Sequence, residues 1–235
     1  MAQLTLDIWS DIACPWCYVG KRRIEGALAR FAHRDAVAVT WRSFELDPSA
    51  PRELALEVPM AERLARKYGT SAEEAQRMMD RMTGVAAQDG LEFRFDRIRP
   101  GNTFDAHRLL HLAREHEKQD ELEERFFRAY LSEGERIGDR ETLVRLAGEV
   151  GLEVDRARGV LESDAFAAEV REDQAQAAAY GIHGVPFFVL AGRLGVSGAQ
   201  PVETLTRVLE EAWAEVTSAA PDAEQGAVCG PDGCA

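Results

Sequence analysis

A CPWC motif at residues 14–17 lies between a segment with the pattern of a β-strand and a segment with the pattern of an α-helix. Residues 4–9 alternate in the manner of a half-buried strand, and apolar side chains in 18–31 recur at helical spacing. Cys14 therefore falls at the N-terminus of a helix, and Cys17 falls one turn inside it. Helix N-termini carry unpaired N–H groups and a partial positive charge, which stabilise a thiolate. The motif predicts a redox-active pair of cysteines on a strand–helix unit.

The residues of this unit have different expected roles. We expect Cys14 to be the nucleophile and Cys17 to be the thiol that resolves a mixed disulfide. Pro15 and Trp16 lie between them and tune the stability of the thiolate, and Trp16 adds no positive charge. Asp7 is an acid within an otherwise apolar strand, and we expect it to lie buried near Cys17 and to accept its proton. The alternative for Asp7 is the exposed face of an edge strand.

The other strand patterns occupy 36–42, 186–190 and 193–197, and helical patterns fill most of the middle of the chain. The resulting order is β-α-β, a helical block, and β-β-α. The two half-sheets need each other to form a core, so both ends of the chain belong to one domain. This order predicts an α/β protein with a thioredoxin fold and a large helical insertion between the two halves of the sheet.

The predicted boundaries follow from this order. The thioredoxin-fold domain comprises residues 1–57 and 181–216, and the inserted helical domain comprises 58–180. Within the insertion, Ser71 and Asp139 are expected to cap helices. Residues 217–235 lack periodicity and are expected to form a flexible tail.

A proline precedes the third strand pattern. The sequence Gly-Val-Pro at 184–186 runs directly into that strand. An X-Pro bond is the only one with an appreciable cis population. A cis-proline facing the CPWC motif would leave the backbone of Val185 free to pair with an extended substrate chain. We therefore expect Val185 and Pro186 to line the active site, with an ordinary strand start as the alternative.

A second pair of cysteines lies in the tail. Cys229 and Cys234 bracket Gly-Pro-Asp-Gly, and a β-turn there brings its ends within about 7 Å. The segment from Thr217 to Cys229 has a flexible span of about 20 Å, against a radius of gyration of about 17–18 Å for a globule of this length. We expect this pair to exchange with Cys14 and Cys17, within one subunit or across a homodimer. Alternatives are incidental cysteines and a zinc site built from both pairs.

The composition excludes several classes of partner. A net charge of −13 argues against nucleic acid and anionic membranes. The N-terminus lacks the features of a signal peptide, and no apolar run approaches the roughly 18 residues of a membrane span. If the chain is complete, we expect it in the cytoplasm, where thiols are kept reduced. His107 and His111 have a spacing that can bind a metal, but no HExxH frame accompanies them, so neither metal nor cofactor is expected.

Four segments carry a resemblance to a known family: DIWSDIACPWC at 7–17, NTFDAHR at 102–108, GIHGVPFF at 181–188 and SGAQP at 197–201. On these segments the chain resembles the DsbA-like thioredoxin-fold proteins of the FrnE type. This group stands near 2-hydroxychromene-2-carboxylate isomerase and the kappa-class glutathione transferases. The resemblance covers residues 4–216 almost entirely.

The resemblance implies a disulfide oxidoreductase or isomerase that acts on protein or low-molecular-weight thiols and disulfides. It implies that Pro186 is cis and that Asn102 and His107 border the active site. In the isomerase and transferase relatives a serine replaces the first cysteine and activates glutathione. Both positions are cysteine here, which favours dithiol exchange. A glutathione-dependent isomerase or transferase is the alternative, and a metal-binding or redox-sensing protein is a third.

Overall fold

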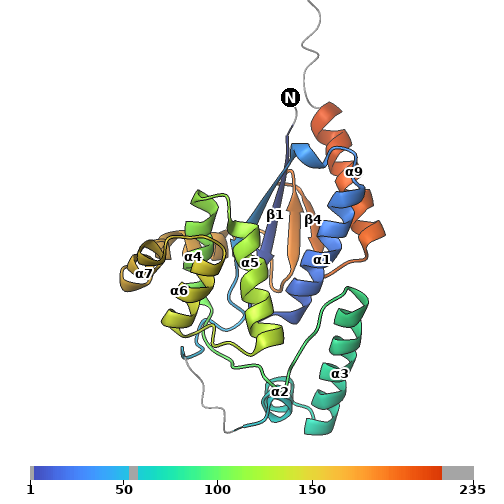
Figure 1. Cartoon of the computed structure of the whole chain (residues 1–235). Helices are drawn as coiled ribbons and strands as arrows, with labels where there is room; N and C mark the ends of the chain where they lie inside the picture. Colours follow the sequence, from blue (N-terminus) through green and yellow to red (C-terminus); the bar gives the residue numbers. More distant parts are fainter. Residues whose placement is uncertain (1–2, 53–57, 219–235) are drawn as a thin grey trace, which may run out of the picture.

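A four-stranded sheet forms the centre of the computed structural model, which describes residues 3–52 and 58–218 (Figure 1). The strands are β1 (Leu4–Ser10), β2 (Val37–Ser43), β3 (Phe187–Leu190) and β4 (Leu194–Ser197), in the order β2-β1-β3-β4. β1 pairs in parallel with β2 and antiparallel with β3, which pairs antiparallel with β4. The predicted α/β class is confirmed, because strands from both ends of the chain share one sheet.

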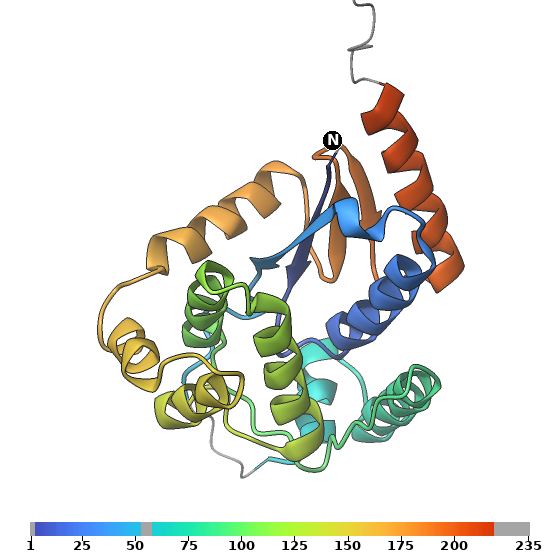
Figure 2. The ribbon, with the colours of Figure 1, turned by 45° about the horizontal axis from the view of Figure 1, so that its top comes forward.

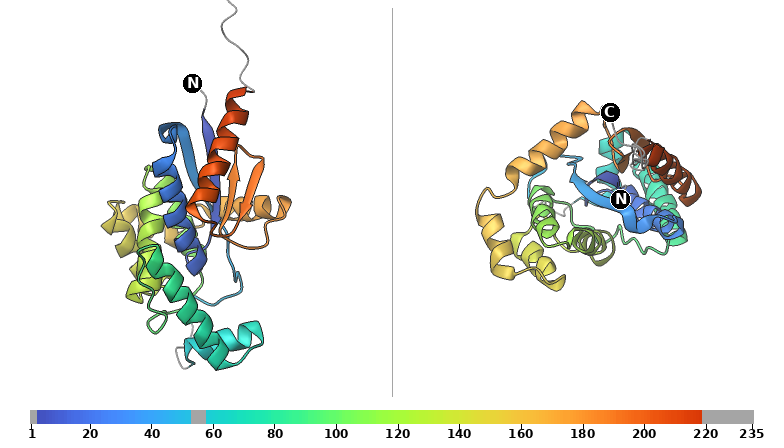
Figure 3. Two further views of the ribbon diagram at one scale, coloured as in Figure 1. Left: turned by 90° about the vertical axis from the view of Figure 1, so that its right-hand side faces the viewer. Right: turned by 90° about the horizontal axis from the view of Figure 1, so that it is seen from above.

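Two helices, α1 (Pro15–Arg30) and α9 (Val202–Ser218), cover one face of this sheet and lie side by side (Figure 3). The alternation of β1 directs Leu4, Leu6 and Ile8 toward them. These side chains pack with Leu205 and Leu209 of α9 into a closed apolar layer. Burial of this layer fixes the register of β1, since a shift by one residue would turn the apolar side chains to the other face.

Helix α8 (Ala167–Ala179) covers the opposite face of the sheet (Figure 2). Ala177 packs there with Trp9 and Val189, and the indole N–H of Trp9 donates to the carbonyl of Asp173 at 2.9 Å. Helix α8 falls within 58–180, the range predicted for the inserted domain, yet it packs on the sheet. The division of the chain into two domains stays a prediction.

The helices that follow β2 and precede α8 in the chain form a block, which packs at one end of the sheet (Figures 1 and 2). Its largest buried side chains, among them Phe126 and Phe127, form one core with Cys17, Tyr18 and Val19 of α1. The block consists of α2 (Met60–Tyr68), α3 (Ala72–Gln88), α4 (Phe104–Glu115), α5 (Gln119–Arg128), the π-helical segment η2 (Ala129–Glu133), α6 (Arg140–Glu149) and α7 (Val154–Glu162). The N-terminal half of α1 is thus enclosed between the sheet and the block.

The predicted caps are present in the block. The Ser71 side chain accepts the N–H of Glu74 at 3.1 Å, and the Asp139 side chain accepts the N–H of Thr142 at 2.9 Å. Helix α2 was not distinguished in the sequence; it starts after Pro59 with no side-chain cap. A short 3₁₀ segment, η1 (Arg34–Ala36), precedes β2.

Two further expectations from the sequence concern a membrane span and the cysteines of the tail. Within 3–52 and 58–218, no helix is both long enough and apolar enough to cross a membrane. The second cysteine pair, Cys229 and Cys234, lies outside the described residues.

Candidate active site

The CPWC motif forms the first turn of α1. Cys14 is its N-cap residue, and Pro15 follows at the first helical position, where a missing N–H costs no hydrogen bond. Cys14 donates its N–H to the carbonyl of Asp11 at 2.9 Å, which fixes the entry of the chain into the helix. Both sulfurs are free thiols; Cys14 is 5% exposed and Cys17 is fully buried. Trp16 between them is 44% exposed, so its aromatic ring lies at the surface.

The bond between Val185 and Pro186 is cis, and this segment faces the motif. The thiol of Cys14 donates to the carbonyl of Val185 at 3.5 Å. Gly20 of α1 makes the approach possible, because a Cβ at this position would lie 2.9 Å from Cγ of Pro186. The two segments that the sequence separates by 171 positions therefore meet at the outer cysteine.

Cys17 lies in an environment that holds it protonated. Burial raises its pKa well above the ordinary value, and the hydrogen bond and charge of Cys14 act in the same direction. The backbone of Asp11 and the hydroxyl of Ser10 act against this rise in the pKa. A reaction that uses the Cys17 thiolate must therefore supply an acceptor for its proton.

The expectation that Asp7 lies buried near Cys17 is wrong. Its carboxylate pairs with Nε of Arg42 at 2.7 Å, on the face of the sheet that α8 covers. The alternation of β1 explains the difference. Asp7 shares a face with Trp9, whereas Cys17 packs with the helical block beyond the end of the strand.

A buried acid from another element contacts the last residue of β1. Glu123 of α5 is fully buried, and the hydroxyl of Ser10 donates to its Oε1 at 2.7 Å. Burial raises the pKa of Glu123 to about 7, although His107, Ser10 and Lys21 oppose the shift. The sequence holds a signal for this residue that was missed: Glu123 falls on the apolar stripe of α5 with Leu122, Phe126 and Phe127.

Asp11 organises the loop before the motif. Its two carboxylate oxygens accept the N–H groups of Ala13 at 3.3 Å and Leu46 at 2.8 Å, and Nε2 of His107 lies 3.5 Å from it. Burial disfavours a charge on His107, but Asp11, Glu123 and Glu45 raise its pKa. The histidine named from the sequence therefore lies against the loop that precedes Cys14.

Asn102 has a structural contact at the start of α4. Its side-chain oxygen accepts the N–H of Phe104 at 2.9 Å, and its amide reaches Glu45 at 3.4 Å. His111 lies one turn beyond His107 but faces Ser43 and Asp173, each at 3.1 Å. Because the two histidines contact different acids, they do not form a pair of metal ligands. Among the described side chains, no group of three or more His, Cys, Asp or Glu could hold a metal ion.

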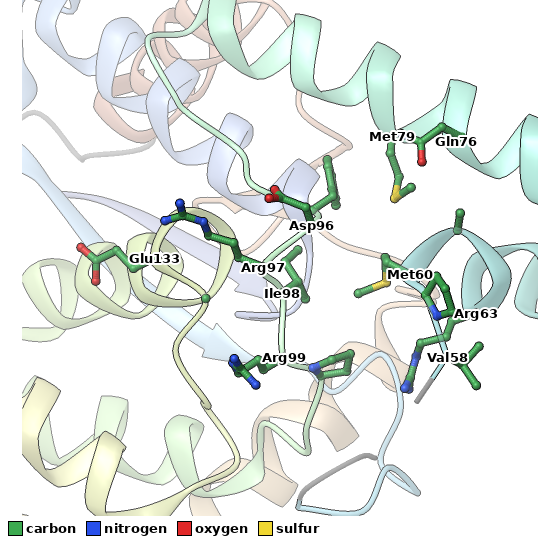
Figure 4. A pocket seen from close by; sticks show the side chains of 15 residues that line it. Val58, Met60, Arg63, Gln76, Met79, Asp96, Arg97, Ile98, Arg99 and Glu133 are labelled. Carbon is green, nitrogen blue, oxygen red and sulfur yellow. The ribbon is translucent and has the colours of Figure 1, made fainter. Parts of the chain in front are cut away.

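A pocket of about 600 Å³ opens between α2, α3 and the segment 95–100 (Figure 4). Ile98 on its wall belongs to the same core as Cys14, and Met60 packs against that core. Arg63, Arg97 and Arg99 also line the pocket, and within the described part of the chain none has a carboxylate at ion-pair distance. Two acids, Asp96 and Glu133, line the pocket as well and pair with Arg94 and Arg125 outside its lining. A pocket with apolar walls and three arginines thus adjoins the core that holds the two cysteines.

Comparison with known proteins identifies similar chains. The sequence model of the family described as "DSBA-like thioredoxin domain" matches residues 5–210. The protein YwbO of Bacillus subtilis is 30% identical over 211 residues, which cover 88% of this chain and 96% of YwbO. A crystal structure described as a probable DsbA oxidoreductase from Streptomyces coelicolor is 47% identical, covers 99% of both chains and has a TM-score of 0.87. The cytosolic disulfide reductase DsbM of Pseudomonas aeruginosa, solved with GSH, has the same fold at 18% identity. Its TM-score is 0.62, with 89% of this chain and 99% of that chain covered.

Proposed function

The chain belongs to the family of DsbA-like thioredoxin domains, and from this premise we propose that it is a cytoplasmic thiol–disulfide oxidoreductase or isomerase of the FrnE type. The observation that carries the proposal is the pair of free thiols at the start of α1, with Cys14, which is 5% exposed, at the N-cap and the fully buried Cys17 one turn further on. The cytosolic reductase with the same fold supports the cytoplasmic location.

The proposed reaction exchanges one disulfide for another. The Cys14 thiolate attacks a substrate disulfide, a Cys14–substrate S–S bond forms, and the other substrate sulfur leaves as a thiolate. Cys17 then loses its proton and attacks the Cys14 sulfur. The Cys14–Cys17 disulfide forms as the second substrate sulfur departs, so the substrate gains two electrons and the protein loses two. The same steps in reverse oxidise a substrate dithiol.

Two features near Cys14 support a protein or peptide substrate. The half-buried Val185 lies beside the sulfur, and its main chain can pair with an extended segment as an added strand would. The exposed ring of Trp16, two residues after Cys14 in the same turn, offers apolar area at the surface. An extended peptide carrying a cysteine would contact both.

The charged pocket favours a second candidate, a glutathione-dependent isomerase or transferase. Arg63, Arg97 and Arg99 supply charge for the carboxylates of a small anionic thiol, and the apolar wall would accept a hydrophobic co-substrate. Both candidates use position 14, but they need different atoms there. Dithiol exchange needs two sulfurs, whereas activation of glutathione needs only a hydrogen-bonding group.

The two cysteines of the tail would add a second exchange step to the first candidate function, the oxidoreductase. Cys229 and Cys234 would exchange with the Cys14–Cys17 pair and relay electrons to or from a partner. Replacement of Cys17 by Ala would then trap an adduct between Cys14 and a tail cysteine.

One set of variants separates these functions. We expect Cys14→Ser and Cys17→Ser to lose at least about 100-fold in insulin reduction and in reactivation of scrambled ribonuclease. Retained exchange in Cys14→Ser would contradict the proposal. Glutathione conjugation or isomerase activity that survives in Cys14→Ser would favour the second candidate instead. Ser71→Ala, which removes a helix cap far along the chain from the motif, is the control for effects of stability alone.

A further inference from the structure

The cis-proline is supported by the segment 198–201, which joins β4 to α9. Gly198 begins this segment in the left-handed backbone conformation, with a φ of 78°, and donates its N–H to the carbonyl of Pro186 at 2.8 Å. The next residue, Ala199, is half-buried and packs against the core that contains Cys14. The position of Pro186 beside the CPWC motif therefore depends on where this segment lies.

Arg23 of α1 joins the segment to the end of α3. Its Nη1 donates to the carbonyl of Ala199 at 2.6 Å. Its Nε and Nη2 lie 3.1 Å and 3.0 Å from Oδ2 of Asp89, which is the C-cap residue of α3. Both charged side chains are only 18% exposed, and a hydrogen bond from a charged donor is about twice as strong as one from a neutral donor. Asp89 thus orients the guanidinium, and the guanidinium holds the carbonyl of Ala199.

The helix that carries Cys14 therefore holds the cis-proline at two points. At Gly20 the backbone of α1 meets the ring of Pro186 directly. On the next turn, Arg23 holds the segment that is hydrogen-bonded to the same proline. Because both contacts belong to α1, they keep the carbonyl of Val185 at its distance of 3.5 Å from the sulfur at the start of that helix.

We propose that Arg23 is a positioning residue for polypeptide substrates of this site. The role rests on the proposed dithiol exchange. Arg23 acts through the segment 198–201, and through it on the main chain of Val185 and Pro186, with which an extended substrate chain pairs. When this main chain is displaced, a polypeptide binds more weakly, whereas the sulfur of Cys14 still reacts. The loss therefore falls on the binding of the chain and spares the exchange step.

Two substrates separate the binding of a chain from the chemistry of the sulfurs. Insulin presents its disulfides on polypeptide chains, whereas bis(2-hydroxyethyl) disulfide has neither a main chain nor a charge. The full-length protein is assayed with each, with dithiothreitol as the reductant that restores the Cys14–Cys17 dithiol, and the uncatalysed rate is subtracted. Saturation kinetics give kcat and KM for insulin, and the initial rates give kcat/KM for the small disulfide.

Arg23→Gln should raise KM for insulin by about 10-fold and leave both kcat and the reaction of the small disulfide within about 2-fold of the parent values. Arg23→Lys keeps a charged donor for the carbonyl of Ala199 and should return KM to within about 3-fold of the parent value. Asp89→Asn removes the ionic partner of Arg23 and should raise KM by about 3-fold. Arg30→Gln is the matched control, because Arg30 lies on the same helix and pairs with Glu203 of α9 at 3.1 Å. It should change neither reaction.

Three results would overturn the role of Arg23. They are an unchanged KM for insulin in Arg23→Gln, an equal loss with both disulfides, and a loss in Arg23→Lys as large as that in Arg23→Gln. If Arg23→Gln does not fold, as judged by circular dichroism, Asp89→Asn carries the prediction, and an unchanged KM in that variant contradicts it. A parent protein that reduces neither disulfide would instead refute the dithiol exchange, and the role of Arg23 with it.

Discussion

At the scale of single residues, the buried Glu123 couples folding to pH. Its pKa rises from the ordinary value of 4.5 to about 7 in the folded protein. The folded state therefore binds a proton more tightly than the unfolded state does. The contribution to stability is fully present below pH 4.5 and is lost as the pH rises through about 7. A difference of this size corresponds to about 3 kcal/mol in the free energy of unfolding.

Glu123→Gln should remove this dependence, because the amide keeps a similar shape and has no charge to bury. The variant should gain about 3 kcal/mol relative to the parent protein between about pH 4 and about pH 8. Urea unfolding of both proteins at the two pH values measures this gain. A constant difference across that range would show that the carboxyl has the same pKa in the folded and the unfolded protein, and would contradict the prediction.

The sequence predicted some residues of the site, but it did not predict the contact made by Glu123. Cys14 and Cys17 follow from spacing within one strand–helix unit, and Pro186 follows from its position before a strand. The contact between Ser10 and Glu123 joins β1 to the middle of the helical block, so no local pattern contains it. Asp7 was misassigned because the alternation of side chains along a strand predicts which residues share a face. It does not predict which helix covers that face.

At the scale of elements, the contact of α1 with the cis-proline segment depends on Gly20. Alanine is ordinarily preferred to glycine inside a helix by about 1 kcal/mol. A Cβ on Gly20 would, however, lie 2.9 Å from Cγ of Pro186. Overpacking of this kind costs about 1–3 kcal/mol. Gly20→Ala should therefore lower the free energy of unfolding by about 1 kcal/mol and slow the attack of Cys14.

Gly84 of α3 provides the matched control, because among the described residues nothing beyond its own stretch of helix lies within 4 Å of the position that a Cβ would take there. Gly84→Ala should raise the stability by about 0.5–1 kcal/mol and leave the exchange rates unchanged. Thermal unfolding compares the two variants directly. Equal stabilisation by both substitutions would contradict the close approach of α1 to Pro186.

The elements themselves were predicted where the sequence has strong local signals. The capped helices α3 and α6 begin where Ser71 and Asp139 indicate. Helix α2 has no side-chain cap, and the π-helical segment at 129–133 continues α5 without a break in the sequence pattern. Such features depend on packing within the block, and short-range periodicity does not encode them.

At the scale of the whole molecule, the end of α9 lies at the opposite end of the sheet from the CPWC motif. Figure 1 shows α9 ending beside the N-terminus, whereas the motif follows the other end of β1. The seven residues of β1 separate these ends by about 20 Å. A chain from Ser218 to Cys229 can extend to about 38 Å at most. Because the flexible span of this segment is also about 20 Å, exchange within one chain is within its reach.

Shortening that linker tests the proposed relay. In a Cys17→Ala, Cys234→Ser protein we expect an adduct between Cys14 and Cys229. Deletion of 221–226 leaves a reach of about 18 Å, so an adduct within one chain should disappear. Any remaining adduct should join two chains and increase with protein concentration. Mass spectrometry of non-reduced samples distinguishes the two, and a concentration-independent adduct after the deletion would contradict the predicted loss of intrachain exchange.

Helix α1 contributes to two cores. Cys17, Tyr18 and Val19 complete the core of the helical block, while Ile24 and Ala27 complete the layer under α9. Without the helical block, the N-terminal half of α1 would be exposed to water, and so would the sulfur of Cys17. The helical block is in this sense the solvent barrier of the proposed redox centre.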